Sequence, residues 1–323
     1  MDAKFIPWRG RVPARWGLDG GPDVWDCGAM FAQQLVNGVL LGATYALFAL
    51  GFTLMFGVLR VINLTYGCYF SAGAFLALFA VRGLGFSIWL ALPGAAIATG
   101  LIGVVVDQLL LSRLRRAGRR AELLSLMVTL GAAEALYAAG SALLGPDIRR
   151  LPAGLVPGAP LRLDGVFITR TQIMILAATL LIVAGLLWLL RGSRFGLAVR
   201  AVAEQPDAAG LMGIDTDRVA RAVSFVAACL AGAAGVLIGL NFNAIQPYMG
   251  EEMMLRGFIV VIVGGLGDIR GALLAGLLLG LVEVMTAGYI ASGMKEAMSF
   301  LILVAVLWTR PNGMFGRASA MRA

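Results

Sequence analysis

The sequence predicts an all-α polytopic membrane protein, a transmembrane helix bundle of about eight or nine membrane passages, some broken or half-length. Composition is the first observation behind this prediction. Hydrophobic residues make up 60% of the 323 residues and charged residues 14%, whereas soluble domains are about 45–50% apolar and about 25% charged. The second is that the apolar residues gather in runs of the ~20 residues that a helix needs to cross the hydrocarbon core.

The predicted spans follow one another along most of the chain. Uncharged or nearly uncharged runs of sufficient length occupy residues 31–56, 61–81, 84–111, 123–144, 171–190, 222–245 and 271–290. Two shorter candidates occupy 257–267 and 297–309. The first is too short to cross alone and runs into GGLGDIRGA, which indicates a broken or half-length helix. Irregular backbone at that depth occurs only inside protein or beside a cavity.

A polar run at 191–221 separates two of these spans and predicts a short helix outside the bilayer. Pro206 suits the first position of that helix and Gly213 the position just past its end, the usual asymmetry of helix termini. Asp207 falls in the first turn, where the helix dipole favours a negative charge.

Arginine bias orients the bundle, because short loops rich in Lys and Arg lie in the cytoplasm. The clearest such loop lies at 112–122 and carries Arg113, Arg115, Arg116, Arg119 and Arg120. Alternation then places 145–170 outside and 191–221 inside. It also places the C-terminal tail inside, if 257–267 counts as a crossing, and the N-terminus outside.

Missing residue types exclude several functions. The chain has no His, which removes the commonest general base and metal ligand. Neither Lys4 nor Lys295 follows a Gly, so the phosphate-binding Gly-Lys-Ser/Thr loop is absent. Three cysteines, Cys27, Cys68 and Cys229, have no paired spacing. We therefore expect no catalytic residue, metal or cofactor, and we attribute the net charge of +8 to inner-face arginines and not to nucleic-acid binding.

Several motifs in a fixed order carry a family resemblance. They are NGVLLGATYALFALGFTLMFGVLRVIN, the run 191–221, PYMG at Pro247, GGLGDIRGALLAGLLLGLVE and RPNGMFG at Arg310. Together they resemble the permease subunits of branched-chain amino acid ABC importers. The resemblance implies a permease domain at 31–316 in a bacterial cytoplasmic (inner) membrane, an N-terminal extension at 1–30 and a tail at 317–323. It also implies ATPase subunits, a second permease subunit, an extracytoplasmic solute-binding protein and surrounding membrane lipid as partners.

The start of the permease domain leaves two interpretations open. Because MFAQQLVNGVLLGATYALFALG resembles the first residues of family members, Met30 is one candidate for the start. The alternative is a disordered outer tail. Residues 1–29 lack the apolar core that a secretory signal needs.

By the same resemblance, the polar run holds a coupling helix that docks into a groove on the ATPase subunit. Arg200, Glu204, Leu211 and Gly213 are among the residues whose spacing matches. The residues assigned to ATPase coupling are Arg200, Glu204, Pro206, Asp207, Leu211 and Gly213. The charges on Arg200, Glu204 and Asp207 would orient the docked helix. The alternative is that these charges only solvate a loop.

The solute pathway has a first candidate at Asn63, Thr65, Tyr66 and Gly67. Family members usually carry Asn-Phe-Ala-His-Gly here, often followed by Glu, in a turn that faces the pathway. In this chain Tyr66 replaces the His and Cys68 stands in place of the Glu. We expect neutral hydrogen-bonding groups beside an apolar path.

A second candidate is the glycine cluster Gly264, Gly265 and Gly267, which is followed by Asp268. The cluster predicts a helix break near a cavity, whose backbone groups would face a zwitterionic ligand, as in broken transporter helices. Helix packing is the simpler interpretation for the spaced glycines Gly271, Gly276 and Gly280.

Carboxylates inside predicted spans are candidates because a charge at mid-bilayer costs at least ~2.5 kcal/mol. Glu283 lies in a family motif and is assigned to the pathway, with a hydrogen-bonded structural role as the alternative. Glu134 would pair with Tyr137 on the same helical face, and Asp107 is interpreted as an interfacial residue.

The predicted function is that of a permease subunit of an ATP-driven importer for a small neutral or zwitterionic solute, above all branched-chain or related amino acids. The alternative is an autonomous secondary transporter or channel for small neutral solutes such as amides or urea. Coupling to an ion gradient would need several charged residues inside the predicted spans. The sequence offers Glu134 and Glu283 as such residues. An intramembrane enzyme is disfavoured because acid–base groups are not clustered.

Overall fold

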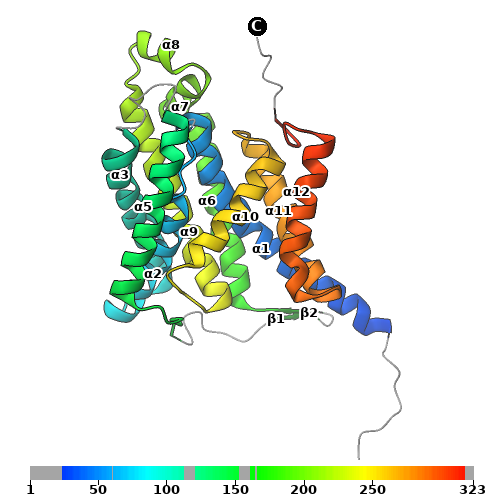
Figure 1. Ribbon diagram of the computed structural model, residues 1–323. Coiled ribbons are helices and arrows are strands. Elements are labelled where there is room, and N and C mark those ends of the chain that lie inside the picture. The colour runs from blue at the N-terminus through cyan, green and yellow to red at the C-terminus, as the bar shows by residue number, and fades with distance from the viewer. Residues whose placement is uncertain (1–23, 60, 113–120, 153–160, 164–165, 317–323) are drawn as a thin grey trace, which may run out of the picture.

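A computed structural model describes residues 24–59, 61–112, 121–152, 161–163 and 166–316, and in this part the fold is a bundle of α-helices (Figure 1). The helices are α1 (Val24–Leu59), α2 (Tyr66–Gly83), α3 (Ile88–Val106), η1 (Asp107–Leu111), α5 (Ala121–Leu144), α6 (Arg170–Gly192), α7 (Arg194–Glu204), α8 (Pro206–Leu211), α9 (Thr216–Phe242), α10 (Met249–Gly264), α11 (Ile269–Tyr289), η3 (Ser292–Met294) and α12 (Lys295–Thr309).

The predicted all-α polytopic fold is confirmed. Among the described residues, seven helical segments are long and apolar enough to cross a membrane: 28–59, 88–111, 124–144, 170–192, 216–242, 269–289 and 292–309. The shorter helices α2 and α10 lie among them. A two-stranded antiparallel hairpin, β1 (Leu161–Leu163) with β2 (Val166–Ile168), was not predicted and lies in the loop before α6.

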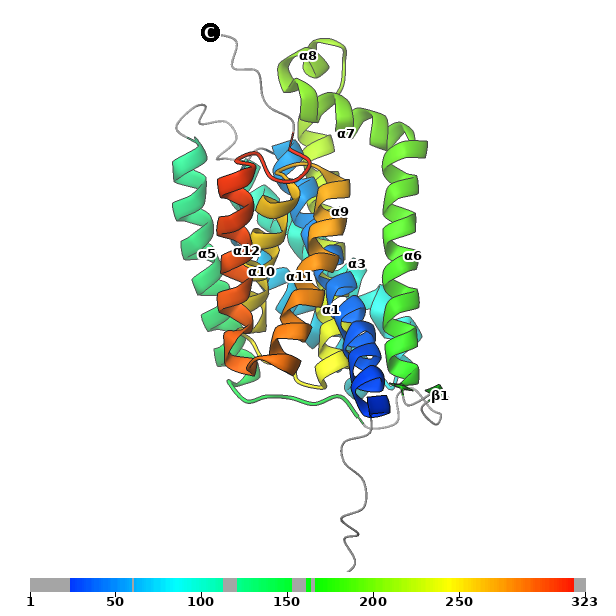
Figure 2. The same cartoon turned by 90° about the vertical axis from the view of Figure 1, so that its right-hand side faces the viewer.

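The two ends of the bundle carry different segments. Helix α8 and the last residues of α12 lie at one end, and the start of α1 and the β-hairpin lie at the other (Figures 1 and 2). We call these the α8 end and the hairpin end. The arrangement matches the predicted alternation, in which the α8 end is cytoplasmic. The arginines of 113–120 lie outside the described residues, as do 1–23 of the predicted extension and the tail 317–323.

Helices α1 and α9 form the interior. Helix α1 packs along α11, α9 packs along α3, and α2 packs on α9. Aromatic rings fill the centre, where Phe48 and Phe52 contact Tyr66 at centroid distances of 4.7 and 5.6 Å. Helices α5, α6 and α12 are mostly exposed and stand at the periphery (Figure 2).

Two groups of four helices repeat one pattern in opposite directions. Helices α1, α2, α3 and α5 run alternately toward and away from the α8 end, and α9, α10, α11 and α12 do the reverse (Figures 1 and 2). The second helix of each group, α2 or α10, is not among the seven membrane-crossing segments of the described residues, and α2 and α10 touch where they begin. A Cβ on Gly250 would lie 1.9 Å from the carbonyl oxygen of Gly67. This is the arrangement of an inverted repeat.

Two helix starts differ from the prediction. Helix α1 begins at Val24 and not at residue 31. Helix α10 begins at Met249 and not at residue 257, so that Glu251, Glu252 and Arg256 belong to it. The hydropathy pattern excluded these three charged residues from the predicted span. The acidic pair nevertheless suits the first turn of a helix, where the helix dipole favours negative charge.

Helix α11 begins with a side-chain cap. Oδ1 of Asp268 accepts hydrogen bonds from the backbone N–H groups of Arg270 (2.8 Å) and Gly271 (3.0 Å). We expect Asp268→Ala to lower the free energy of unfolding by ~1 kcal/mol, because both N–H groups lose this acceptor. Unfolding of the detergent-purified chain measures the loss. Asp268→Asn keeps an acceptor and is the control; equal losses in both variants would contradict the assignment.

Candidate functional site

The polar run forms two successive helices at the α8 end. Ser193 begins α7, its Oγ accepting a hydrogen bond from the N–H of Gly196 at 3.0 Å. Pro206 is the first residue of α8 and Asp207 lies in its first turn, as predicted. Gly213 follows the helix with φ of +85°, a left-handed conformation that favours glycine.

Helix α8 presents apolar side chains to solvent. Leu211 is 91% and Met212 84% exposed, whereas Ala209 is buried against the rest of the loop. Glu204 and Asp207 are also exposed. The helix protrudes from the bundle (Figure 1), and its exposed tip is apolar with acidic side chains beside it.

Helix α7 connects this tip to the bundle. It packs on α6, α1 and α9 and buries Gly196, Val199 and Val202. Nη1 of Arg200 donates a hydrogen bond to the carbonyl of Leu190 at the end of α6, so this arginine helps to hold α7 against α6. A displacement of α8 would therefore reach three helices of the bundle through α7.

The predicted turn at residues 63–67 is present and buried. Oδ1 of Asn63 accepts hydrogen bonds from the backbone N–H of Thr65 at 3.0 Å and from its hydroxyl at 2.6 Å. The Tyr66 hydroxyl donates to the carbonyl of Phe48 at 3.0 Å. Gly67 lies against Gly250. These polar groups bond within the core of the chain, and their role in a solute pathway stays a prediction.

The glycine break between α10 and α11 lies at the α8 end of the bundle (Figure 1). Gly265 and Gly267 have φ of +105° and +86°. The carbonyls of Val263 and Gly264 accept hydrogen bonds from the backbone N–H groups of Met314 (2.8 Å) and Phe315 (3.1 Å). The motif RPNGMFG thus packs on the break. A role of Gly264, Gly265 and Gly267 in the pathway stays a prediction.

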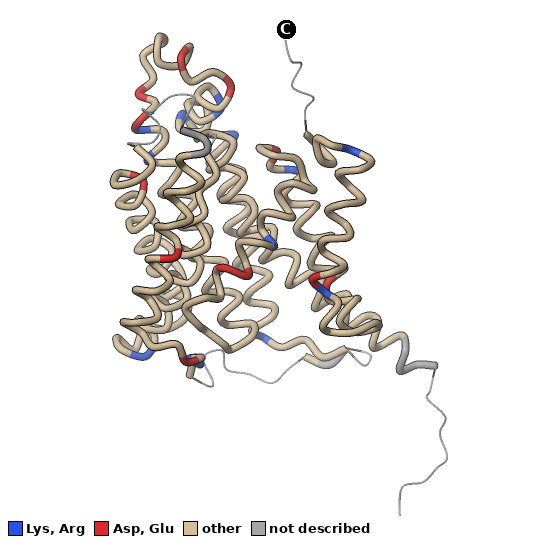
Figure 3. Tube along the Cα trace, viewed as in Figure 1, with Lys and Arg blue, Asp and Glu red and all other residues tan. Residues whose placement is uncertain are grey.

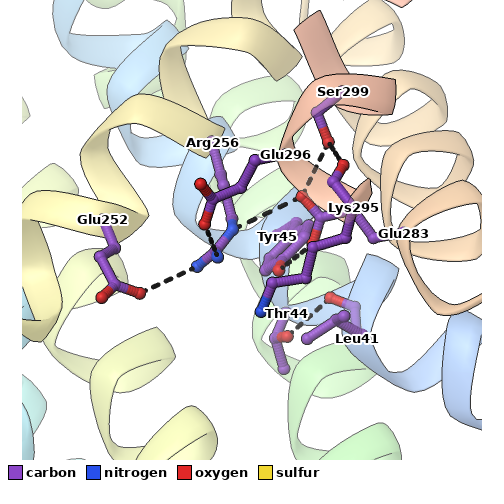
Figure 4. A network of polar contacts seen from close by, with 9 residues as sticks. All are labelled: Leu41, Thr44, Tyr45, Glu252, Arg256, Glu283, Lys295, Glu296 and Ser299. Atoms are coloured by element: carbon purple, nitrogen blue, oxygen red, sulfur yellow. Dashed lines mark hydrogen bonds and ion pairs between the residues drawn. The ribbon is translucent and has the colours of Figure 1, made fainter. Parts of the chain in front are cut away.

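Glu283 is the centre of a buried polar network that joins α1, α10, α11 and α12 (Figure 4). Its carboxylate accepts hydrogen bonds from the Tyr45 hydroxyl at 2.7 Å and from the Ser299 hydroxyl at 2.9 Å. Nε of Arg256 lies 3.5 Å from Oε1 of the same carboxylate. The hydrogen bonds expected of a structural role are present, and the assignment of Glu283 to the solute pathway stays a prediction.

The sequence interpretation missed Arg256. Its guanidinium lies 3.7 Å from a carboxylate oxygen of Glu252 and 3.7 Å from one of Glu296, and 5.9 Å from the centre of the Tyr45 ring. One cation thus faces three carboxylates, counting Glu283. The sequence did contain an indication of this contact. Arg256 directly precedes an apolar run and follows Glu252 by four residues, the spacing of an ion pair along a helix.

Two other acidic residues differ from the prediction. Glu134 is exposed on α5 and does not pair with Tyr137, and the buried hydroxyl of Tyr137 has no hydrogen-bond partner among the residues that the structure describes. The phenol ring stacks on Tyr248 at 5.6 Å. Asp107 is fully buried and accepts a hydrogen bond from Ser224 at 3.1 Å. It is the first residue of the π-helical turn η1, which packs on α9, so it is not the interfacial residue that the sequence suggested.

A multi-pass bundle with inverted helix groups and a helix that protrudes from one end defines a membrane transport permease. The chain belongs to the family described as the permease component of the branched-chain amino acid transport system, which matches residues 34–307. It is accordingly a multi-pass transport protein of the cytoplasmic membrane and not an enzyme.

Curated relatives cover nearly the same region. The high-affinity branched-chain amino acid transport system permease protein BraD of Pseudomonas aeruginosa is 31% identical over 89% of this chain and 96% of its own length. The corresponding protein LivH of Escherichia coli is 32% identical with the same coverage. A probable branched-chain amino acid transport permease protein of Methanocaldococcus jannaschii is 28% identical over 87% of this chain.

Proposed function

We propose that this chain is the permease subunit of an ATP-driven importer and that ATPase subunits dock on α8. The exposed tip of α8 carries the proposal. Two large apolar side chains, Leu211 and Met212, are almost fully exposed at the α8 end, in a part of the chain that lies between two membrane-crossing segments. A short amphipathic helix of this kind fits a groove on a partner, and burying it offsets the cost of exposing Leu and Met to water.

The proposed pathway forms against a second permease subunit. Charged positions occur between the two ends of the bundle on α5, α10 and α12 (Figure 3). Glu252 is 63% and Glu296 65% exposed, and Glu134 is exposed on α5. Exposure of these charged side chains to lipid would cost several kcal/mol. We infer that another protein subunit or a water-filled path covers this face.

The solute is proposed to be a small zwitterionic or neutral molecule, first of all a branched-chain amino acid, delivered by an extracytoplasmic solute-binding protein. The named substrates of the curated relatives support this class. ATP-driven closure of the ATPases would move α8, and α7 would transmit the movement to α1, α6 and α9. The two permeases would then alternate between outward and inward access.

One observation favours the alternative of an autonomous secondary transporter. The span region holds more ionisable groups than the sequence suggested, because Glu251, Glu252 and Arg256 lie on α10 beside Glu283. Intramembrane charges of this kind mark ion pathways in transporters. An autonomous transporter needs no ATPase bound to α8. Substitutions at the α8 tip therefore distinguish the two functions.

We expect Leu211→Asp together with Met212→Asp to abolish co-purification with the ATPase subunits and solute-stimulated ATP hydrolysis. Central apolar contacts are worth at least ~2 kcal/mol, or a ~30-fold loss of affinity. Leu161→Asp at the hairpin end is the matched control and leaves association intact. If the double variant still associated with the ATPase subunits, an autonomous transporter or channel would become the better-supported function.

A further inference from the structure

A cavity of about 300 Å³ opens at the hairpin end, between α1, α6, α9 and α11. The described residues of its lining include no charged one and divide into polar and apolar parts. The polar part consists of the carboxamides Gln34, Asn37, Gln172 and Asn241. The volume is at the small end of the range for ligand sites.

The carboxamides keep hydrogen-bonding capacity for a ligand. Oδ1 of Asn37 accepts from Nε2 of Gln172 at 3.1 Å and from Nε2 of Gln33 at 3.4 Å. Asn37 lines the cavity, and among the described residues its Nδ2 has no acceptor. Within the described part of the chain, the side chains of Gln34 and Asn241 have no hydrogen-bond partner. Each of them offers one acceptor and two donor hydrogens.

The apolar part of the cavity lies deeper along the seam between α1 and α11. Leu41 precedes Tyr45 by one helical turn, and Ala287 follows Glu283 by one turn, so both pairs share a helix face. The cavity therefore ends one turn away from the Tyr45–Glu283 hydrogen bond. A ligand that occupies it would contact aliphatic side chains on its inner side and amides on its outer side.

We propose that this amide-lined cavity is the outer binding site of the permease and takes an α-amino acid with an aliphatic side chain. The proposal rests on the import function proposed above. Amide N–H groups donate to the carboxylate and amide oxygens accept from the ammonium group, so a ligand without net charge needs no charged partner. Leu40, Leu41 and Val284 contact the aliphatic side chain.

Direct binding to the purified full-length chain, without ATPase or solute-binding protein, tests the site. We expect saturable binding of radiolabelled L-leucine that weakens at least ~10-fold in Asn37→Leu with Asn241→Leu, because hydrogen bonds to charged groups are lost. Gln108→Leu also replaces a carboxamide by an alkyl group, on an exposed side chain at the other end, and leaves binding unchanged. Equal binding by all three proteins would overturn the proposal.

A protection experiment avoids relying on variants that alter folding. In a chain whose three cysteines are replaced by alanine, Asn241→Cys would react with a membrane-impermeant maleimide. We expect L-leucine to slow this reaction at least ~5-fold and glycerol to leave it unchanged. Protection by isobutyramide but not by leucine would overturn the amino-acid assignment. Equal protection by glycerol and leucine would show that the cavity is a water-filled vestibule and not a binding site. Neither leucine binding nor maleimide protection depends on ATPase docking. A negative result in the α8 experiment would therefore leave the test of this cavity unaffected.

Discussion

Replacing Arg256 by Met is expected to lower the free energy of unfolding by ~3–5 kcal/mol. The reason is the environment of Glu283, which is 2% exposed and lies within ion-pair distance of Arg256. Tyr45 and Ser299 would still donate hydrogen bonds, but the carboxylate would lose the cation that offsets its desolvation. Breaking a buried pair by removing one partner is costly because it leaves an uncompensated charge.

A double-mutant cycle identifies the pair as the cause. Arg256→Met with Glu283→Met removes both charges, and such replacements are often close to neutral. We therefore expect the double variant to regain most of the loss, with a coupling energy in the range of 0.5–3 kcal/mol that contacting residues show. Denaturation of the detergent-solubilised chain provides the free energies.

The control for this cycle is Glu296→Gln. Glu296 also faces Arg256 at 3.7 Å, but its side chain is 65% exposed, so the variant should cost under ~1 kcal/mol. If the double variant were as unstable as Arg256→Met alone, Arg256 would act by packing its aliphatic stem and not through its charge on Glu283.

Much of the fold could be predicted from local pattern. The apolar runs identified the crossing helices, because a helix in lipid must satisfy its own backbone and needs a fixed length of apolar residues. Helix α8 could be predicted to the residue at its start, since Pro206 lacks an N–H that the first helical position does not use. These features depend on neighbours in sequence, which a single chain displays.

The parts that could not be predicted depend on which helices face one another. Hydropathy excluded Arg256 from a span, although in the folded chain Glu252, Glu283 and Glu296 surround it from three helices. The pairing proposed for Glu134 with Tyr137 considered one helix alone, and the two side chains have different surroundings. The amide-lined cavity likewise combines residues of four helices, and no periodicity within one helix indicates it.

Gly250→Ala is expected to have the other large effect. Its Cβ would lie 1.9 Å from the carbonyl oxygen and 2.7 Å from the carbonyl carbon of Gly67. These are backbone atoms, so no side-chain rotation relieves the contact, and α2 and α10 must move apart at the point where the two helix groups meet. Overpacking a tight core costs 1–3 kcal/mol and sometimes more, and we expect a loss of at least ~3 kcal/mol here.

Gly140→Ala is the matched control for this substitution. Gly140 lies within α5 and a Cβ there meets nothing within 4 Å, so alanine should stabilise the helix by ~0.5–1 kcal/mol. Opposite signs for the same chemical change would locate the effect in the crossing of α2 and α10. If Gly250→Ala unfolded like the unmodified chain, the two helices would not meet at Gly67 and Gly250, and the inverted groups would pack through a different contact.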